Sequence, residues 1–296
     1  MIVILGTTAS GKTQLAVKLA RRFNGEIISA DSRQVYQGMD VGTGKDLKEY
    51  GKIHYHLIDI VSPKTQISVA DWQQKAYQAI ADILKRGKVP IICGGTGLYI
   101  SALIEGYVLP SAKSYKLKAI SLRSRLDELT LKELLTRLRK IDFETYKIID
   151  RKNRRRVQRA LEIYYLTGQS KSTQLKKEKP PYEFFLLGLT FPKDILSKRI
   201  EKRLKQRLEK EGLIDEVRKL RRQGVSWKRL DEFGLEYRFI AKYLQKKISY
   251  EEMVEQLKKA IVNFAKRQMT WFKRDKKIKW LKHQSAAKNL VSKFLT

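Results

Sequence analysis

Short apolar segments alternate with longer segments of helical periodicity along the first hundred residues of the chain. Ile2 to Leu5, Glu26 to Ala30 and Lys88 to Cys93 have the length and continuity of strands buried on both faces of a sheet. Between them, residues 12–22 and Val69 to Arg86 place apolar side chains three and four positions apart, as amphipathic helices do. Strands that alternate with helices predict a parallel α/β sheet.

The pattern changes after about residue 110. Residues 113–170 are charged, helical in period and rich in Arg, and Lys176 to Pro181 has the composition of a linker or turn. The apolar run from Phe184 to Leu189 predicts one more strand, which returns to the sheet. From Pro192 to about Phe272 the pattern is helical again, with breaks at glycines.

These changes predict an α/β fold with a P-loop NTPase-like parallel sheet, an inserted helical domain and C-terminal helices. Residues 1–110 and 183–296 would form the core, and residues 111–182 the helical insertion. Charge is divided unevenly along the chain, because residues 1–100 carry a net +5 of the total of +32. The remaining +27 predicts a polyanionic partner, with nucleic acid ahead of an anionic membrane surface.

Composition also excludes several classes of protein. A single cysteine, Cys93, lies in a predicted buried strand, so neither a disulfide framework nor a cysteine-based zinc site is expected. The three histidines lack the spacing of metal ligands. No run approaches the ~20 apolar residues of a membrane span, and the apolar start of the chain is too short for a signal peptide. We therefore expect a cytoplasmic protein without membrane contact, and a monomer.

The segment after the first predicted strand fits the pattern G-x-x-x-x-G-K-[ST] of a phosphate-binding loop. Its glycines let successive backbone amides face a phosphate, and the following helix adds a partial positive charge. Lys12 supplies a cation, and the Thr13 hydroxyl can ligate Mg²⁺ between two phosphates. The motif predicts a diphosphate or triphosphate ligand without saying which molecule carries the phosphates.

Two further strand ends carry polar residues. Asp31-Ser32-Arg33-Gln34 follows the second strand, and Gly94-Gly95-Thr96-Gly97 follows the third. Ligands of parallel sheets bind beyond the carboxyl ends of strands, so these segments are expected at one site with the phosphate loop. There Asp31 would be a general base or a metal ligand, and the Gln34 amide could read the edge of a base.

Two basic segments are candidates for contact with nucleic acid. The first is Arg151 to Arg156 followed by Arg159, since the planar arginine side chain donates paired hydrogen bonds to phosphates and bases. The second is Arg267 to Arg274, which interleaves cations with Trp271 and Phe272. These aromatics would either stack on an unpaired base or anchor the last helix in the core.

Taken together, these motifs resemble those of the tRNA dimethylallyltransferases (tRNA isopentenyltransferases, the IPP transferase family) over nearly the whole chain. Departures include Thr7 where Pro is usual and Gly44 where Ala is usual. The likeness rests on the following segments: Ala9-Ser10-Gly11-Lys12-Thr13, Ser29 to Tyr36, Gly38 to Thr43, His56 to Asp59, Gly94 to Tyr99, Arg156 with Arg159 to Tyr164, and Ala265 to Gln268 with Thr270-Trp271-Phe272.

Members of that family transfer a dimethylallyl group from dimethylallyl diphosphate to the exocyclic N6 amine of the adenosine 3′ of the anticodon, and the resemblance implies the same here. It implies Asp31 as the general base, assisted by Lys12, Thr13, Thr96 and Arg123, with Mg²⁺ on the diphosphate. The implied diphosphate-binding residues are Gly6, Thr7, Thr8, Ala9, Ser10, Gly11, Lys12 and Thr13. Those implied to contact the tRNA anticodon stem-loop are Asp31, Ser32, Arg33, Gln34, Thr96, Arg123, Arg155, Arg156, Val157, Gln158, Arg159, Arg267 and Gln268.

Other functions share parts of this sequence pattern. A P-loop kinase of a nucleoside or small alcohol has the same glycine loop and uses ATP, but it does not need the basic excess beyond residue 100. A transferase that prenylates free adenine nucleotides does not need the arginine-rich insertion. An RNA-binding protein with a degenerate nucleotide site would not be expected to keep Lys12, Thr13 and Asp31 together.

Overall fold

A computed structural model describes residues 1–109, 116–168, 170, 177–281 and 283–295. The chain divides into two compact units. The core unit comprises Met1–Ile67, Trp72–Ile104 and Pro181–Thr296, and the helical unit comprises Ser68–Asp71 and Glu105–Pro180. The expected linker begins at Lys176 and the expected insertion at residue 111, and both of these positions lie outside the described residues.

The core unit is built on a six-stranded sheet with the order β3-β2-β4-β1-β5-β6, and every neighbouring pair is parallel. The predicted α/β fold with a P-loop-like parallel sheet is therefore confirmed. Four of the strands were predicted from their apolar runs, whereas the two short edge strands β3 and β6 were not. The strands are β1 (Ile2–Gly6), β2 (Gly25–Ser29), β3 (Tyr55–His56), β4 (Val89–Gly94), β5 (Phe185–Leu189) and β6 (Lys279–Leu281).

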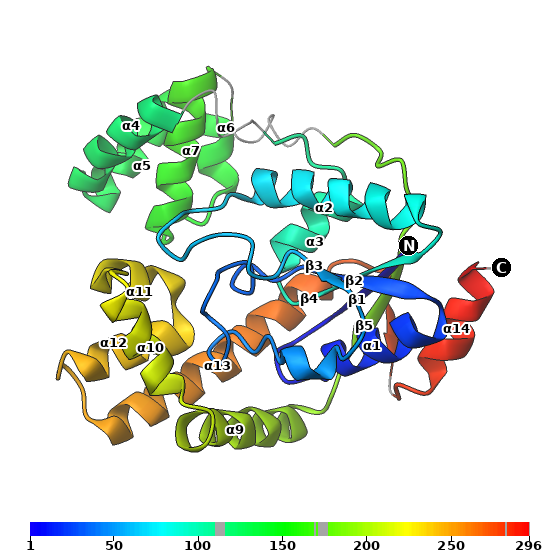
Figure 1. Ribbon diagram of the computed structural model, residues 1–296. Coiled ribbons are helices and arrows are strands. Elements are labelled where there is room, and N and C mark those ends of the chain that lie inside the picture. Colours follow the sequence, from blue (N-terminus) through cyan, green and yellow to red (C-terminus); the bar gives the residue numbers. More distant parts are fainter. Residues whose placement is uncertain (110–115, 169, 171–176, 282, 296) are drawn as a thin grey trace. The chain divides into compact units, whose positions relative to one another are not determined.

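Helices α1 (Lys12–Arg22) and α14 (Ala286–Leu295) pack on the same face of this sheet, as Figure 1 shows. Alternate residues of the strands, such as Ile2 and Ile4, point into this layer and are completely buried there. Burial of each such side chain stabilises the fold by ~1.5–3 kcal/mol relative to exposure. The packed sheet thus fixes the direction in which β1 enters the phosphate loop.

Two helices that follow sheet strands, α2 (Val69–Lys85) and α3 (Gly97–Ile104), are joined by aromatic packing within the core unit. Trp72 is completely buried, stacks on Tyr99 with 4.5 Å between ring centroids, and donates its indole N–H to the Ser29 carbonyl at 3.2 Å. This contact ties α2 to Ser29 at the end of β2, two residues before Asp31.

The chain after β5 forms the predicted C-terminal helices, separated by turns at Gly212, Gly224 and Gly234. No helix in the described part of the chain combines the length and apolar character needed to cross a bilayer. The helices are α9 (Lys193–Glu209), α10 (Leu213–Arg222), α11 (Trp227–Phe233), α12 (Leu235–Leu244) and α13 (Tyr250–Phe272), and a 3₁₀ turn, η1 (Leu47–Glu49), precedes β3.

The helical unit has a small apolar core of its own. A capping box between Thr130 and Glu133 starts α5, and Asn153 caps α7 by accepting the N–H of Arg156. The core contains Leu126, Leu134, Leu138, Val157, Ala160 and Leu161. The helices are α4 (Lys116–Glu128), α5 (Leu131–Ile141), α6 (Phe143–Ile148) and α7 (Arg154–Thr167).

Candidate active site

A cavity of about 1300 Å³ opens in the core unit where strands β1, β2 and β4 end. Its walls include residues 8–13 after β1, residues 31–34 after β2 and residues 94–97 after β4. Asp31 and the phosphate loop therefore face one space, as expected for ligand sites at the carboxyl ends of parallel strands.

The loop after β1 has the backbone of a phosphate cradle. Ala9 and Gly11 have φ values of 59° and 79°, in the left-handed region, and α1 begins at the next residue, Lys12. The Lys12 ammonium donates to the carbonyl of Thr7 at 2.7 Å. The Ser10 hydroxyl is completely buried and has no hydrogen-bond partner among the described residues. An unpaired buried hydroxyl at the base of the loop suits a phosphate oxygen.

Burial lowers the pKa of Lys12, and the carboxylate of Asp31 is one of the groups that oppose this shift. A buried ammonium is poorly solvated, so an anion that enters the cavity gains a strong electrostatic contact there. Burial also raises the pKa of the Cys93 thiol to about 12. Cys93 is thus a neutral wall residue, in agreement with its position in a buried strand.

Asp31 lies on a segment that is held from both sides. Its Oδ1 accepts the backbone N–H of Arg33 at 2.8 Å, and the N–H of Ser32 donates to the Thr96 hydroxyl at 3.0 Å. Gly94 lets this close approach happen, because a Cβ there would overlap the backbone of Ala30. The turn after β4 therefore fixes the position of the candidate base.

The amide of Gln34 is used inside the protein rather than free to read a base. Its oxygen accepts the Ser29 hydroxyl at 2.8 Å, and its nitrogen donates to the Gly44 carbonyl at 3.0 Å. Arg33 donates to the carbonyl of Glu232 at 3.2 Å, and burial lowers the pKa of its guanidinium. Both side chains line the cavity while holding its wall.

Gln268 joins the two glycine loops. It accepts the backbone N–H of Thr8 at 2.9 Å and donates to the carbonyl of Gly95 at 2.8 Å, and its side chain is almost completely buried. Trp271, three residues later, donates its indole N–H to the Ser101 hydroxyl at 3.2 Å. Phe272 is buried and anchors α13, whereas Trp271 is partly exposed and lines the cavity.

Positive charge dominates the cavity walls, and much of it comes from α9, which the sequence analysis did not assign to the site. Arg203 pairs with Asp46, while burial lowers the pKa of Arg207 and raises that of its partner Glu236. The α9 cations are spaced by three and four residues in the sequence, a pattern that predicts one basic face of a helix. The cationic lining residues are Lys12, Arg33, Arg199, Lys202, Arg203, Arg207, Arg238 and Arg267.

The remaining predicted residues lie in the helical unit. Arg123 donates to Glu162 through Nε at 2.7 Å and Nη2 at 3.2 Å, and Arg159 donates to the same carboxylate at 2.8 Å. Arg155 and Arg156 are exposed, as polyanion contacts require. Gln158 is partly exposed and donates to the Asp127 carboxylate at 2.8 Å.

Val157 is a correction to the predicted RNA-contacting set. Its side chain is completely buried with Ala160 and Leu161 in the core of the helical unit. The helical period places positions three and four apart on one face, so the basic residues around Val157 face outward while it faces inward.

Comparisons with known proteins agree with this fold. The sequence model of the IPP transferase family matches residues 34–275. "tRNA dimethylallyltransferase 1" of Syntrophus aciditrophicus is 47% identical over 278 residues, which cover 93% of this chain and 89% of that protein. "tRNA dimethylallyltransferase 2" of Treponema denticola is also 47% identical, over 93% of this chain and 92% of that protein.

Solved structures lead to the same family. The tRNA isopentenylpyrophosphate transferase of Bacillus halodurans has a TM-score of 0.69 and 39% identity, covering 95% of this chain and 88% of that one. A eukaryotic dimethylallyltransferase, solved acting on tRNA, has a TM-score of 0.77 and 29% identity, covering 92% of this chain and 69% of that one. The resemblance read from the sequence motifs is confirmed, and the chain belongs to the IPP transferase family of enzymes.

Proposed function

We propose that this chain transfers a dimethylallyl group from dimethylallyl diphosphate to the N6 amine of the adenosine 3′ of the anticodon in tRNA. The observation that carries the proposal is the single cavity that Asp31 shares with the phosphate loop. The names of the relatives support the choice of both substrates. With tRNA as its acceptor, the enzyme would act in the cytoplasm, as a monomer.

In the proposed reaction, a bond forms between N6 of adenine and the allylic carbon, while the bond from that carbon to the diphosphate oxygen breaks. The departing diphosphate keeps the electron pair, and Asp31 accepts the proton that N6 loses. The adenine amine is a poor nucleophile because its lone pair is delocalised into the ring. A positioned base of this kind typically contributes ~10²–10⁴-fold to the rate. The Asp31 carboxylate keeps one oxygen for this role, since its hydrogen bond to the N–H of Arg33 uses the other.

The leaving diphosphate would lie in the cradle formed by residues 8–13. Lys12 and the loop amides would stabilise the developing negative charge in a poorly solvated site, where such contacts are strongest. When bound, Mg²⁺ would neutralise charge on the leaving diphosphate. Thr13 would supply a hydroxyl ligand to it. In the described residues, no group of three acidic, histidine or cysteine side chains could hold a metal ion.

The tRNA would contact both units. In the core unit, the cationic wall that includes Arg33 and Arg267 suits the backbone of an unpaired anticodon loop. The proposed insertion, residues 111–182, would bind the anticodon stem through its exposed arginines Arg155 and Arg156. The target adenine must leave its stack to enter the cavity, which costs a few kcal/mol, and contacts to phosphates offset this cost.

Labelled transfer assays test the proposal. The purified protein is incubated with labelled dimethylallyl diphosphate and one of three acceptors: transcribed tRNA, the same tRNA with the target adenosine changed to guanosine, or free adenosine monophosphate. We expect label on the transcribed tRNA that keeps the target adenosine, and on neither of the other two acceptors. Transfer to the free nucleotide would identify a nucleotide prenyltransferase instead. In a parallel incubation with ATP in place of dimethylallyl diphosphate, consumption of ATP, together with no prenyl transfer in the first assay, would indicate a kinase.

A further inference from the structure

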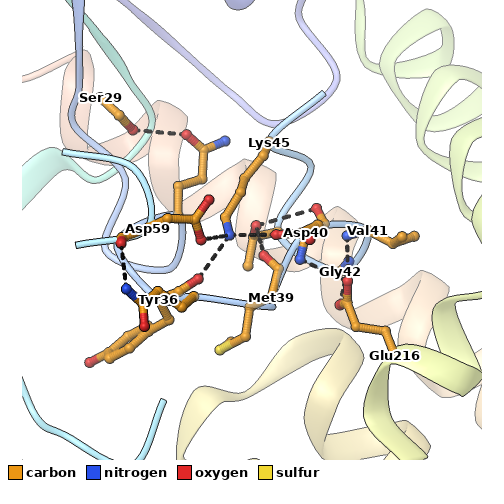
Figure 2. Close-up of polar contacts among 12 residues, drawn as sticks. Ser29, Tyr36, Met39, Asp40, Val41, Gly42, Lys45, Asp59 and Glu216 are labelled. Carbon is orange, nitrogen blue, oxygen red and sulfur yellow. Dashed lines mark hydrogen bonds and ion pairs between the residues drawn. The ribbon is translucent and has the colours of Figure 1, made fainter. Parts of the chain in front are cut away.

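Next to the candidate site, an ion cluster forms around one buried lysine in the segment of residues 36–45 (Figure 2). Lys45 is completely buried and donates to the carboxylate of Asp40 at 2.6 Å, to the carboxylate of Asp59 and to the carbonyl of Tyr36 at 2.8 Å. A lysine is rarely this buried unless its charge is fully compensated. The cluster thus joins three points of the chain, residues 36, 40 and 59, through one side chain.

A second contact holds the outer turn of the same segment. The Glu216 carboxylate, from α10, accepts the backbone N–H groups of Asp40 at 2.7 Å, Val41 at 2.6 Å and Gly42 at 3.1 Å. Figure 2 shows Glu216 reaching this turn from a separate helix. The Tyr237 hydroxyl donates to the same carboxylate at 2.8 Å. Successive amides that converge on one carboxylate form charge-assisted hydrogen bonds, which are shorter and stronger than neutral ones.

These contacts close a ring around Gln34. The side-chain amide of Gln34 donates to the carbonyl of Gly44, which directly precedes Lys45. Lys45 in turn pairs with Asp59, and the backbone N–H of Asp59 donates to the backbone carbonyl of Gln34 at 3.1 Å. Gln34 lies three residues after Asp31, and on the other side of Asp31 the Ala30 carbonyl accepts the N–H of Thr96 at 3.2 Å. The candidate base therefore lies between two anchored points, one of which depends on Lys45.

The same segment also forms part of the cavity wall. Gly42, Thr43 and Gly44 line the cavity, whereas the charged groups of Lys45 and Glu216 lie behind them. A change in Lys45 or Glu216 would therefore alter the wall and Gln34 without removing an atom that touches the substrates. This separation distinguishes positioning residues from catalytic ones.

We infer that Glu216 and Lys45 are positioning residues, which hold the segment of residues 31–34 and its base in the reactive geometry. The inference rests on the proposed function. The physical reason is that reacting atoms must meet within a few tenths of an ångström, and a misplacement of 1 Å can reduce the rate ~100-fold. Within the described residues, no hydrogen bond or ion pair joins the phosphate loop to the side chain of Lys45 or Glu216, so the affinity of the loop for diphosphate is expected to be independent of them.

Glu216→Gln provides the test. It keeps the shape of the side chain, but one of the two oxygens that accept the N–H groups of Asp40, Val41 and Gly42 is replaced by a donor. Asp215→Asn is the matched control, because it removes the same charge one residue earlier on α10, where Asp215 is exposed and pairs with Arg218 on the surface. Lys45→Met and its exposed control Lys48→Met form a second pair.

For each variant, kcat of tRNA prenylation, the Kd for inorganic diphosphate and the thermal unfolding midpoint are measured. We expect Glu216→Gln to lower kcat ~10–100-fold, with diphosphate affinity within about threefold of the wild type and both controls unchanged. A wild-type kcat in folded Glu216→Gln would overturn the inference, as would an equal loss of diphosphate binding. Lys45→Met is expected to lower kcat in the same way if it folds. If it unfolds, Glu216→Gln decides the outcome.

The two proposals fail in different ways. If the wild-type enzyme transfers no dimethylallyl group to tRNA, the proposed function is wrong. If the wild type is active and Glu216→Gln is equally active, only the positioning role is wrong.

Discussion

The substitution Asp31→Asn isolates proton transfer from the other roles of this residue. Asparagine has the same shape, and its side-chain oxygen can still accept the N–H of Arg33, which lies 2.8 Å from Oδ1. The local hydrogen bond, with a net contribution of ~0.5–1.5 kcal/mol, is thus retained and folding should be little affected. What is lost is a group that can accept a proton at neutral pH.

The expected loss in kcat is ~10²–10⁴-fold, the typical contribution of a general base. This corresponds to ~2.7–5.5 kcal/mol of transition-state stabilisation. Single-turnover transfer of labelled dimethylallyl to tRNA measures the chemical step directly, and a filter assay gives the Kd for tRNA. The Kd should stay within about twofold, because one interior charge adds little to a contact that is dominated by many phosphates. Asp82→Asn, a matched change at an exposed position on α2, should have no effect on either value.

One side effect of Asp31→Asn has to be separated from the loss of the base. The Asp31 carboxylate raises the pKa of Lys12 against the effect of burial, so its removal should lower that pKa further. If the loss arose from deprotonated Lys12, activity would recover as the pH is lowered. A missing base predicts no recovery. A loss of less than fivefold at every pH, or a loss of tRNA affinity as large as the loss of rate, would refute the role of Asp31 as the base.

Three further predictions concern stability and RNA binding. Burial tends to raise the pKa of Glu26, but hydrogen bonds from Arg86, Lys88 and His56 outweigh it and hold the pKa well below its usual range. Glu26→Gln should therefore cost ~1–3 kcal/mol in urea unfolding at pH 7, and the deficit should shrink as the pH falls below ~4.5. Gly44 has a φ of +62°, so Gly44→Ala should lower the free energy of unfolding by ~1–2 kcal/mol. The added methyl group would also overlap Arg207, so the effects of Gly44→Ala and Arg207→Met on that free energy should be non-additive. Arg156→Ala should weaken tRNA binding and reduce the salt slope by ~0.7–0.9.

Each of these three has an outcome that contradicts it. The stabilising ion pairs of Glu26 should be lost when its carboxylate is protonated. An equal difference in unfolding free energy between wild type and Glu26→Gln at pH 7 and in acid would therefore contradict this role. Strict additivity of Gly44→Ala and Arg207→Met would show that the two sites do not touch. An unchanged salt slope for Arg156→Ala would show that its guanidinium contacts no phosphate.

Much of the core could be predicted from sequence because its signals are local. The apolar run of β1, the glycine loop and the helical period from Lys12 follow one another within about twenty residues. Each is determined by the backbone preferences and burial of neighbouring positions, so no distant partner is needed to recognise it. The ends of parallel strands also meet at one sheet edge, so the sequence by itself predicts that Asp31 and Thr96 share one site.

The tertiary structure decided features whose partners lie far apart in sequence. Gln268 joins loops 173 and 260 residues away, and Lys45 is buried only because Asp59 and the segment of residues 36–40 enclose it. Such side chains look like ordinary surface residues in a sequence, since their own neighbours do not show what will surround them. The edge strands β3 and β6, of two and three residues, are likewise too short to show a period and exist because a neighbouring strand offers hydrogen bonds. Local pattern thus determined the elements and the chemistry at their ends, whereas long-range packing determined which side chains hold that chemistry in place.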